Sequence, residues 1–191
     1  IARLQQLTPP RLVASAPAAA VFRTGTAPPD DPQAGMHKPF PAAKVDRVIG
    51  GGATVRFGNL LLTSIATPGH TAGALSWRWE SCDGGVCRTM VYADSLTPVS
   101  RDDYRFSDHP AELAAFRSSI DRIAAARCEI LLTPHPSASA MKERMTGAKR
   151  GSRSRNCTAS GTSHIVSTFD ALAPLKRRSY GPFPWTWYAM A

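Results

Sequence analysis

The sequence predicts a layered α/β protein whose sheet is largely antiparallel or mixed. Three observations lead to this class. Short apolar runs are separated by turns that contain Gly, Pro or Asn, as expected of neighbouring strands. One long segment has apolar residues three and four positions apart, as in an amphipathic helix, and a further apolar run follows it. An order of strands, one helix and another strand favours a sheet with a helix packed on its face.

The strands are predicted from apolar runs that end at turn-forming residues. Residues 53–57 alternate between polar and apolar side chains, turn at Gly58-Asn59, and return as the apolar run of residues 60–66. A similar pair flanks the turn Asp83-Gly84-Gly85-Val86. The predicted strands are residues 12–15, 45–49, 53–57, 60–66, 75–80, 89–93 and 129–133.

Two helices are predicted after the first residues of the chain. Residues 16–23 form a short helix with Pro17 in its first turn. The longer helix begins near Pro110, is capped by Ser107 or Asp108, and ends before Cys128. Its apolar stripe is built from four residues, Leu113, Phe116, Ile120 and Ile123.

The beginning of the chain has the pattern of a helix interior. Ile1, Leu4 and Leu7 are three residues apart, and no capping residue precedes them. We therefore expect the chain to be cut from a longer one, so that the absence of a visible signal peptide says nothing about its compartment. No run of 18 or more apolar residues exists, so no membrane-spanning segment is predicted.

The positive charge of this chain is concentrated near its C-terminus. The net charge is +9, but residues 1–140 carry 14 Lys and Arg against 12 Asp and Glu, whereas residues 141–191 carry 9 against 2. No aromatic residue interleaves the basic run of residues 149–155. The sequence therefore predicts no specific nucleic-acid partner, and the tail has no periodic apolar face. A shifted reading frame is one hypothesis for this tail.

The four cysteines favour an oxidising compartment such as the periplasm. Cys82 and Cys87 flank the turn of the predicted hairpin, which suggests a short disulfide. Cys128 and Cys157 are candidates for a second bridge. Four reduced thiols remain the alternative.

Two predicted strands end in a His that is flanked by proline. Residues 60–66 are followed by Thr67-Pro68-Gly69-His70-Thr71, and residues 129–133 are followed by Pro134-His135-Pro136. His is the commonest metal ligand, and its neutral ring suits zinc. His70 and His135 are therefore predicted to lie in one site at one edge of the sheet.

Five motifs together resemble the third subclass of the metallo-β-lactamases. They are TPGHTAG at 67–73, SCDGGVC at 81–87, VYADSLTPVS at 91–100, YRFSDHP at 104–110 and ILLTPHPSAS at 130–139. The resemblance runs from residue 1 to about residue 147. It implies that residues 1–147 are a partial metallo-β-lactamase domain, the C-terminal portion of an αββα sandwich. Residues 148–191 are then a basic, irregular tail.

The resemblance also implies a site with two zinc ions that hydrolyses β-lactam antibiotics in the periplasm. His70 matches a ligand of the first zinc, and His135 matches a ligand of the second. Ser95 and Thr97 match the residues that hold the substrate carboxylate. A metal-bound hydroxide attacks the lactam carbonyl in such enzymes, so no protein nucleophile is expected.

One zinc motif of the family, His-x-His-x-Asp-His, is absent from this sequence. The chain is expected to begin just after that motif, and two histidines are fewer than a catalytic zinc needs. We therefore expect these 191 residues alone to bind zinc weakly and to be inactive. Two alternatives remain: another hydrolase of the same fold acting on thioesters or lactones, which Asp94 keeps open, and a non-catalytic product of a truncated gene.

Overall fold

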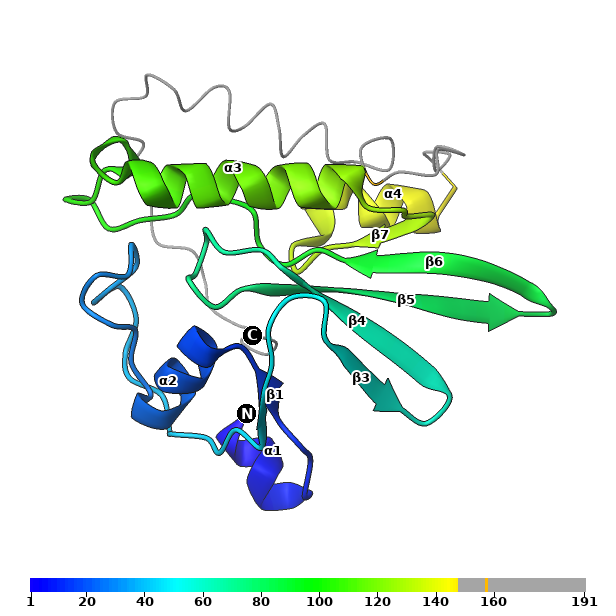
Figure 1. Ribbon diagram of the computed structural model, residues 1–191, viewed down its shortest axis with the longest axis horizontal. Coiled ribbons are helices and arrows are strands. Elements are labelled where there is room, and N and C mark those ends of the chain that lie inside the picture. The colour runs from blue at the N-terminus through cyan, green and yellow to red at the C-terminus, as the bar shows by residue number, and fades with distance from the viewer. Residues whose placement is uncertain (148–156, 158–191) are drawn as a thin grey trace.

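A mixed five-stranded sheet forms the centre of the molecule (Figure 1). The structure is a computed structural model that describes residues 1–147 and Cys157. The strands lie in the order β3-β4-β5-β6-β7, with antiparallel pairing except between β6 and β7, which are parallel. This confirms the predicted class. Their bounds are β3 (Thr54–Phe57), β4 (Leu60–Ala66), β5 (Leu75–Asp83), β6 (Val86–Tyr92) and β7 (Ile130–Leu132).

Local sequence explains how the strands are connected. Gly58 has a φ of 58° and lies in the two-residue turn between β3 and β4. Gly84 and Gly85 both have positive φ and form the turn between β5 and β6. Parallel strands need a longer crossover, and helix α3 (Pro110–Ala125) lies between β6 and β7.

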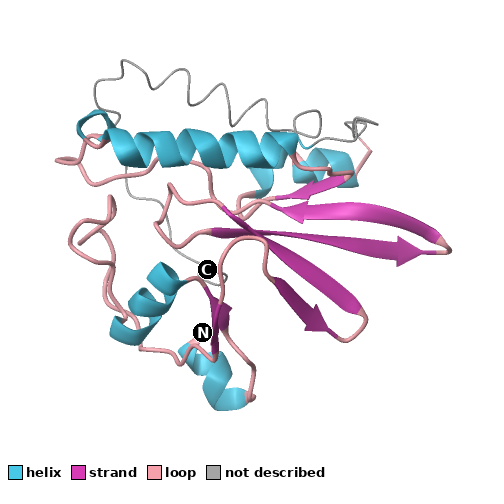
Figure 2. Ribbon diagram, in the orientation of Figure 1, coloured by secondary structure: helices cyan, strands magenta, loops and turns pink. Residues whose placement is uncertain are grey.

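The remaining elements precede or follow this sheet. Before it come α1 (Ala2–Leu7), β1 (Val13–Ala14), α2 (Ala16–Thr24) and β2 (Arg47–Val48), and β1 pairs with β2 in parallel. The short helices η1 (Phe106–Asp108), η2 (Pro136–Ser139) and α4 (Met141–Met145) flank α3 and β7. In Figure 2, α3 and α4 lie on one side of the sheet, and α1, α2 and β1 lie on the other.

Helix α3 packs on one face of the sheet through its apolar stripe. Phe116 and Ile123 are fully buried with Val91 of β6 and Leu131 of β7. The predicted cap was wrong, because the residue that precedes the first turn is His109, and its side chain forms no capping hydrogen bond. Ser107 and Asp108 belong instead to η1.

The opposite face of the sheet carries many apolar side chains that are not buried. Strand pairing places Trp79 beside Met90, and Phe57 beside Leu60, on the face that does not carry Val91. Apart from Leu75 at the start of β5, the apolar side chains of the strands on this face are not buried, and Phe57 is 75% exposed. We call this the open face: Val55, Phe57, Leu60, Leu62, Trp77, Trp79, Met90, Tyr92, Ile130 and Leu132.

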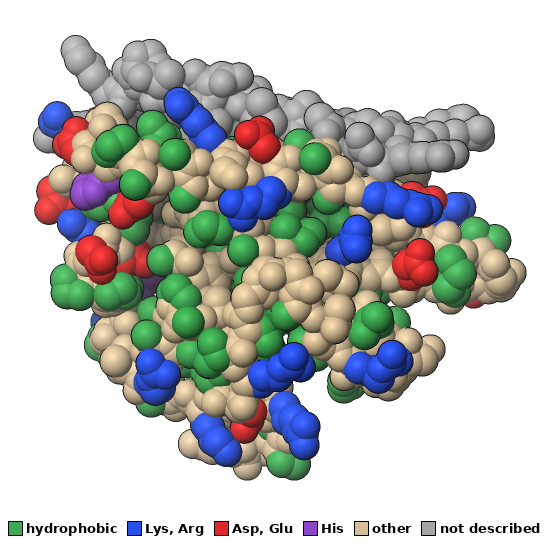
Figure 3. Space-filling view, viewed as in Figure 1, with side chains coloured by type: hydrophobic (Ala, Val, Ile, Leu, Met, Phe, Trp, Pro, Cys, Tyr) green, Lys and Arg blue, Asp and Glu red, His purple; other side chains and the backbone are tan. Residues whose placement is uncertain are grey.

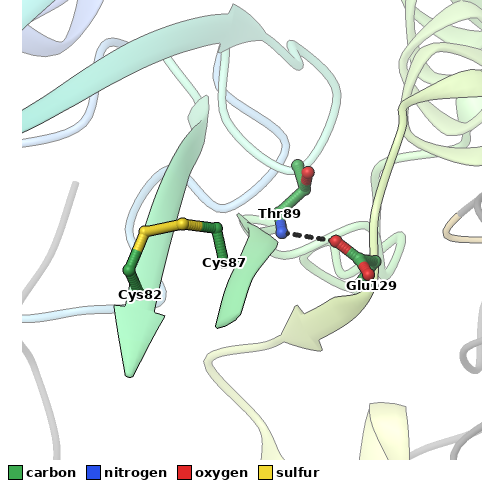
Figure 4. Close-up of a disulfide and its surroundings, with 4 residues drawn as sticks. All are labelled: Cys82, Cys87, Thr89 and Glu129. Atoms are coloured by element: carbon green, nitrogen blue, oxygen red, sulfur yellow. Dashed lines mark hydrogen bonds between the residues drawn. A yellow bond between two sulfur atoms is a disulfide. The ribbon is translucent and has the colours of Figure 1, made fainter. Parts of the chain in front are cut away.

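The predicted hairpin disulfide joins Cys82 to Cys87 across β5 and β6 (Figure 4). Cys128 and Cys157 are free thiols in the structure, and both are buried in the cluster beneath α3. Their hydrogen bond to each other, together with burial, raises the pKa of the Cys157 thiol. A second bridge between them stays a prediction.

The helices, the surface charges and the C-terminal tail bear on three further predictions. Across the described residues, no helix is both long and apolar enough to span a membrane. On the face drawn in Figure 3, the Lys and Arg side chains are interspersed with Asp and Glu. The predicted tail, residues 148–191, lies outside the described residues except for Cys157.

Candidate metal centre

Three strands end at the same edge of the sheet, and the candidate ligands follow them. Strand β4 ends at Ala66 opposite Leu75, the first residue of β5. Strand β6 ends opposite Trp77 of β5, and β7 ends beside the last residue of β6. The segments that carry the candidate residues therefore all leave this edge, which lies at the left of the sheet in Figure 2.

Close backbone packing shapes the turn that carries His70. A Cβ atom on Gly73 would lie 2.5 Å from the backbone nitrogen of Ala18, and one on Gly69 would lie 2.6 Å from the ring of Phe116. Only glycine fits these approaches. The hydroxyl of Ser15 caps α2 by accepting a hydrogen bond from Ala18 N–H, and it donates to the carbonyl of Gly73 at 2.7 Å. The turn is thus fixed between α2 and α3.

The ring of His70 is held in one tautomer. Its Nδ1 lies 2.7 Å from the carbonyl oxygen of Thr97. Because a carbonyl can only accept, Nδ1 carries the proton and Nε2 keeps a lone pair. Metal-binding histidines commonly donate their other ring N–H to a carbonyl in this way. The geometry therefore leaves Nε2 of His70 able to bind a cation.

Asp94 and Ser95 follow β6 directly. The backbone N–H of Ser95 donates to Oδ1 of Asp94 at 2.7 Å, and Asp94 is partly buried. Burial raises the pKa of this carboxyl, while the Ser95 N–H and the nearby His70 act in the opposite direction. Ser95 is 8% exposed, and its Oγ has no hydrogen-bond partner in the structure.

Buried hydroxyl groups connect the ends of β4, β5 and β6. Thr67 Oγ1 lies 2.9 Å from Ser76 Oγ, and both residues are fully buried. Ser76 Oγ also accepts the backbone N–H of Asp94 at 2.9 Å. These bonds satisfy polar groups that burial would otherwise leave unpaired, and they hold the segments of His70 and Asp94 at a set spacing.

His135 is positioned by a short turn at the end of β7. Thr133 Oγ1 donates to the carbonyl of His135 at 2.8 Å and lies 2.9 Å from Ser139 Oγ. The backbone N–H of Ala138 donates to the same carbonyl. The His135 side chain is exposed at the start of η2.

One residue that the sequence reasoning missed touches His70. Gln33 donates its side-chain N–H to the carbonyl of His70 at 3.1 Å, and the same nitrogen lies 3.5 Å from Nε2 of the ring. Nε2 of His37 lies 3.4 Å from the side-chain oxygen Oε1 of Gln33. No local pattern marks Gln33, because 37 residues separate it from His70.

The predicted residues meet only in part. His70 contacts Thr97 through the main chain, Ser95 lies on the same segment as Thr97, and His135 leaves the same sheet edge. Within residues 1–147 and Cys157, no three His, Cys, Asp or Glu side chains form a group that would hold a metal. Since a catalytic zinc uses three protein ligands, the described residues do not make a zinc site on their own.

Solved structures that are similar to this chain carry β-lactamase names. No family model matches the chain. It is 46% identical to MIM-2 metallo-β-lactamase, with a TM-score of 0.76 over 90% of this chain and 61% of that one. It is 42% identical to MIM-1 from Novosphingobium pentaromativorans, with a TM-score of 0.81 over 89% of this chain and 62% of that one.

This chain covers a larger share of two further solved structures. The chain is 37% identical to SMB-1 metallo-β-lactamase, with a TM-score of 0.76, and covers 69% of it. It is 32% identical to MEM-A1, a subclass B3 enzyme from a soil metagenome library, with a TM-score of 0.79. The fold and these similarities define a metallo-β-lactamase. Within that class the chain belongs to subclass B3, which confirms the predicted third subclass. It spans about three fifths of the length of MIM-1 and MIM-2.

Proposed function

We propose that a protein of its relatives' length that contains these residues hydrolyses β-lactam antibiotics with zinc, and so confers resistance to them. The observation that supports this most is the His70 ring, whose Nδ1–H is bound by Thr97 and whose Nε2 keeps its lone pair. His135 is the second proposed ligand, at the same edge of the sheet. Zinc in such a site supplies Lewis acidity and activates water.

The chain's own residues are assigned binding and positioning roles. Ser95 and Thr97 are proposed to hold the substrate carboxylate, and the unpaired, buried Oγ of Ser95 supports such a role for that residue. Asp94, Ser76 and Thr67 hold the two segments together beneath the site. A periplasmic location is proposed with the enzyme, and the hairpin disulfide supports an oxidising compartment.

We expect the 191-residue chain alone to be inactive. Two imidazoles do not complete a catalytic zinc site, so the purified chain loaded with zinc should bind the metal weakly and should not turn over nitrocefin at a useful rate. Spectrophotometric nitrocefin assays with and without a chelator test this. Chelator-sensitive turnover by the chain alone would show that it is active without further ligands.

A chimaera tests the proposal in the other direction. The N-terminal part of MIM-2 placed before Ile1 is expected to restore chelator-sensitive nitrocefin hydrolysis. His70→Ala or His135→Ala should then each abolish it, whereas His109→Phe, which keeps an aromatic ring stacked on Tyr104, should not. A folded, zinc-binding chimaera that cleaves thioesters or lactones but no β-lactam would refute the proposed substrate class.

A further inference from the structure

Arg101 links two irregular segments that lie far apart in the sequence. Its Nη1 donates to the carbonyl of Asp31 at 2.8 Å, and its backbone N–H donates to the carbonyl of Pro32 at 2.9 Å. The same guanidinium pairs with Asp103 at 2.9 Å and lies over the ring of Tyr104, 5.2 Å from its centre. The side chain is therefore held on several sides, and it is partly buried.

Two more contacts turn this link into a closed ring around His70. Gln33 follows Pro32 and donates to the carbonyl of His70. The ring of His70 donates from Nδ1 to the carbonyl of Thr97, four residues before Arg101 on the same segment. Hydrogen bonds therefore join three segments in a closed loop: residues 31–33 to residue 70, residue 70 to residue 97, and residue 101 back to residues 31 and 32. We call this arrangement the His70 ring of contacts.

Regular secondary structure does not order two of these three segments. Residues 25–46 and 93–105 contain neither helix nor strand, so backbone ladders do not fix their positions. The spacing between Gln33 and Thr97, which both hold His70, then depends on the contacts of Arg101. A guanidinium suits this task because it is planar and offers several N–H donors in fixed directions, whereas a lysine ammonium is a flexible point charge.

We propose that Arg101 is a positioning residue that keeps the imidazole of His70 in a single tautomer and orientation. It acts through Asp31 and Pro32 on one side and through Thr97 on the other. Its relevance to catalysis rests on the proposed metal role of His70. Its effect on the imidazole does not rest on that role, and it can be measured without metal.

The first experiment is NMR of the metal-free 191-residue chain labelled with ¹⁵N-histidine. The ring nitrogens of His70, assigned through His70→Gln, should show one tautomer with a slowly exchanging Nδ1–H. In Arg101→Ala and Arg101→Lys the exchange of this proton should rise about tenfold, the loss of roughly one hydrogen bond, and a second tautomer should appear. Arg105→Ala is the matched control, because Arg105 is exposed and lies outside the ring of contacts.

A second variant guards against loss of folding. Gln33→Ala keeps every contact of Arg101 but opens the His70 ring of contacts at another point, so it should cause the same spectral change. Thermal unfolding shows which variants stay folded. If folded Arg101→Lys keeps one tautomer and the native exchange rate, the inference is wrong, whatever Gln33→Ala does.

The chimaera separates this inference from the proposed function. Loss of a group that orients a metal ligand typically weakens metal binding about 10- to 100-fold. If Arg101→Lys alters the His70 tautomer and weakens zinc binding by such a factor, the positioning role of Arg101 and the metal role of His70 both stand. If the tautomer changes while zinc affinity does not, the positioning role of Arg101 stands and the metal role of His70 fails.

Discussion

Gly73 determines how closely the turn that carries His70 approaches helix α2. It accepts a hydrogen bond from Ser15 while its α-carbon packs against the backbone of Ala18. Any side chain at this position has to displace main-chain atoms. Main-chain atoms move less easily than the end of a flexible side chain. The orientation of His70 therefore depends on a residue that has no side chain.

Gly73→Ala is expected to lower the free energy of unfolding by about 1–3 kcal/mol, the usual cost of overpacking. The added Cβ would lie 2.5 Å from Ala18 N and 2.7 Å from Ser15 Oγ. Urea unfolding followed by tryptophan fluorescence measures the loss. Gly50→Ala is the control, because no atom lies within 4 Å of its Cβ position. Equal stability of the two variants would contradict the close approach.

At the residue scale, local sequence pattern marks some residues of the candidate site and not others. His70 and His135 were recognisable because each follows an apolar run and a turn-forming residue. Gln33 and Arg101 were not, because their contacts join segments 37 and 70 residues apart. Such contacts depend on how loops fold over the sheet edge, and neither a periodicity nor a motif records that.

At the scale of elements, Glu129 ties β6 to the beginning of β7. Its carboxylate accepts the backbone N–H of Thr89 at 2.9 Å, as Figure 4 shows, and its own N–H donates to the Thr89 carbonyl. The hydrogen bond from Thr89 and, to a lesser extent, the charge of Arg88 hold the pKa of Glu129 below its ordinary value. Folding is thus linked to the ionisation of this group.

Glu129→Gln is expected to make the stability of the chain less sensitive to acid. A carboxyl whose pKa is lower in the folded state contributes stability above its unfolded pKa of about 4.5, and this is lost as the pH falls through the folded value. The urea midpoint should therefore fall less between pH 6 and pH 3 in the variant than in the native chain. Glu80→Gln, at an exposed position on β5, should fall as the native chain does. An unchanged pH dependence in Glu129→Gln would count against the linkage.

The elements were predicted well where a pattern spans several residues. Strand β4 has its predicted bounds, and α3 begins at the predicted proline. The hairpin strands are longer than predicted: β5 reaches Asp83, and β6 begins at Val86. The reason is that cross-strand pairing continues through polar residues up to the disulfide. The cap of α3 was wrong because η1 takes up Ser107 and Asp108, which leaves His109 to precede the helix.

At the scale of the whole molecule, the described residues bury a large apolar cluster on one face of the sheet, beneath α3. Val91 and Leu131 are fully buried under α3, whereas the ten side chains of the open face are not buried. A contiguous apolar surface of this kind favours association in water.

Phe57→Lys is expected to reduce self-association and binding of the dye ANS. Phe57 is 75% exposed on the open face, and a charge there should oppose the burial that drives association. Sedimentation velocity and ANS fluorescence measure the two effects. The control is Leu61→Lys, on the same hairpin but on the face that α3 covers, where Leu61 is 46% exposed. An equal or larger effect of Leu61→Lys would show that the open face is not the associating surface.

The tip of the β5–β6 hairpin is far from the candidate metal centre. Asp83 at the tip is eight positions along the extended strand from Leu75 at the site edge, a span of about 25 Å. Gly84 and Gly85 have no atom within 4 Å of their Cβ positions, and the disulfide closes the strands just beneath them. A fluorophore or affinity peptide inserted between these two glycines would thus report on the molecule, or immobilise it, without reaching the ligands at the other end of the sheet.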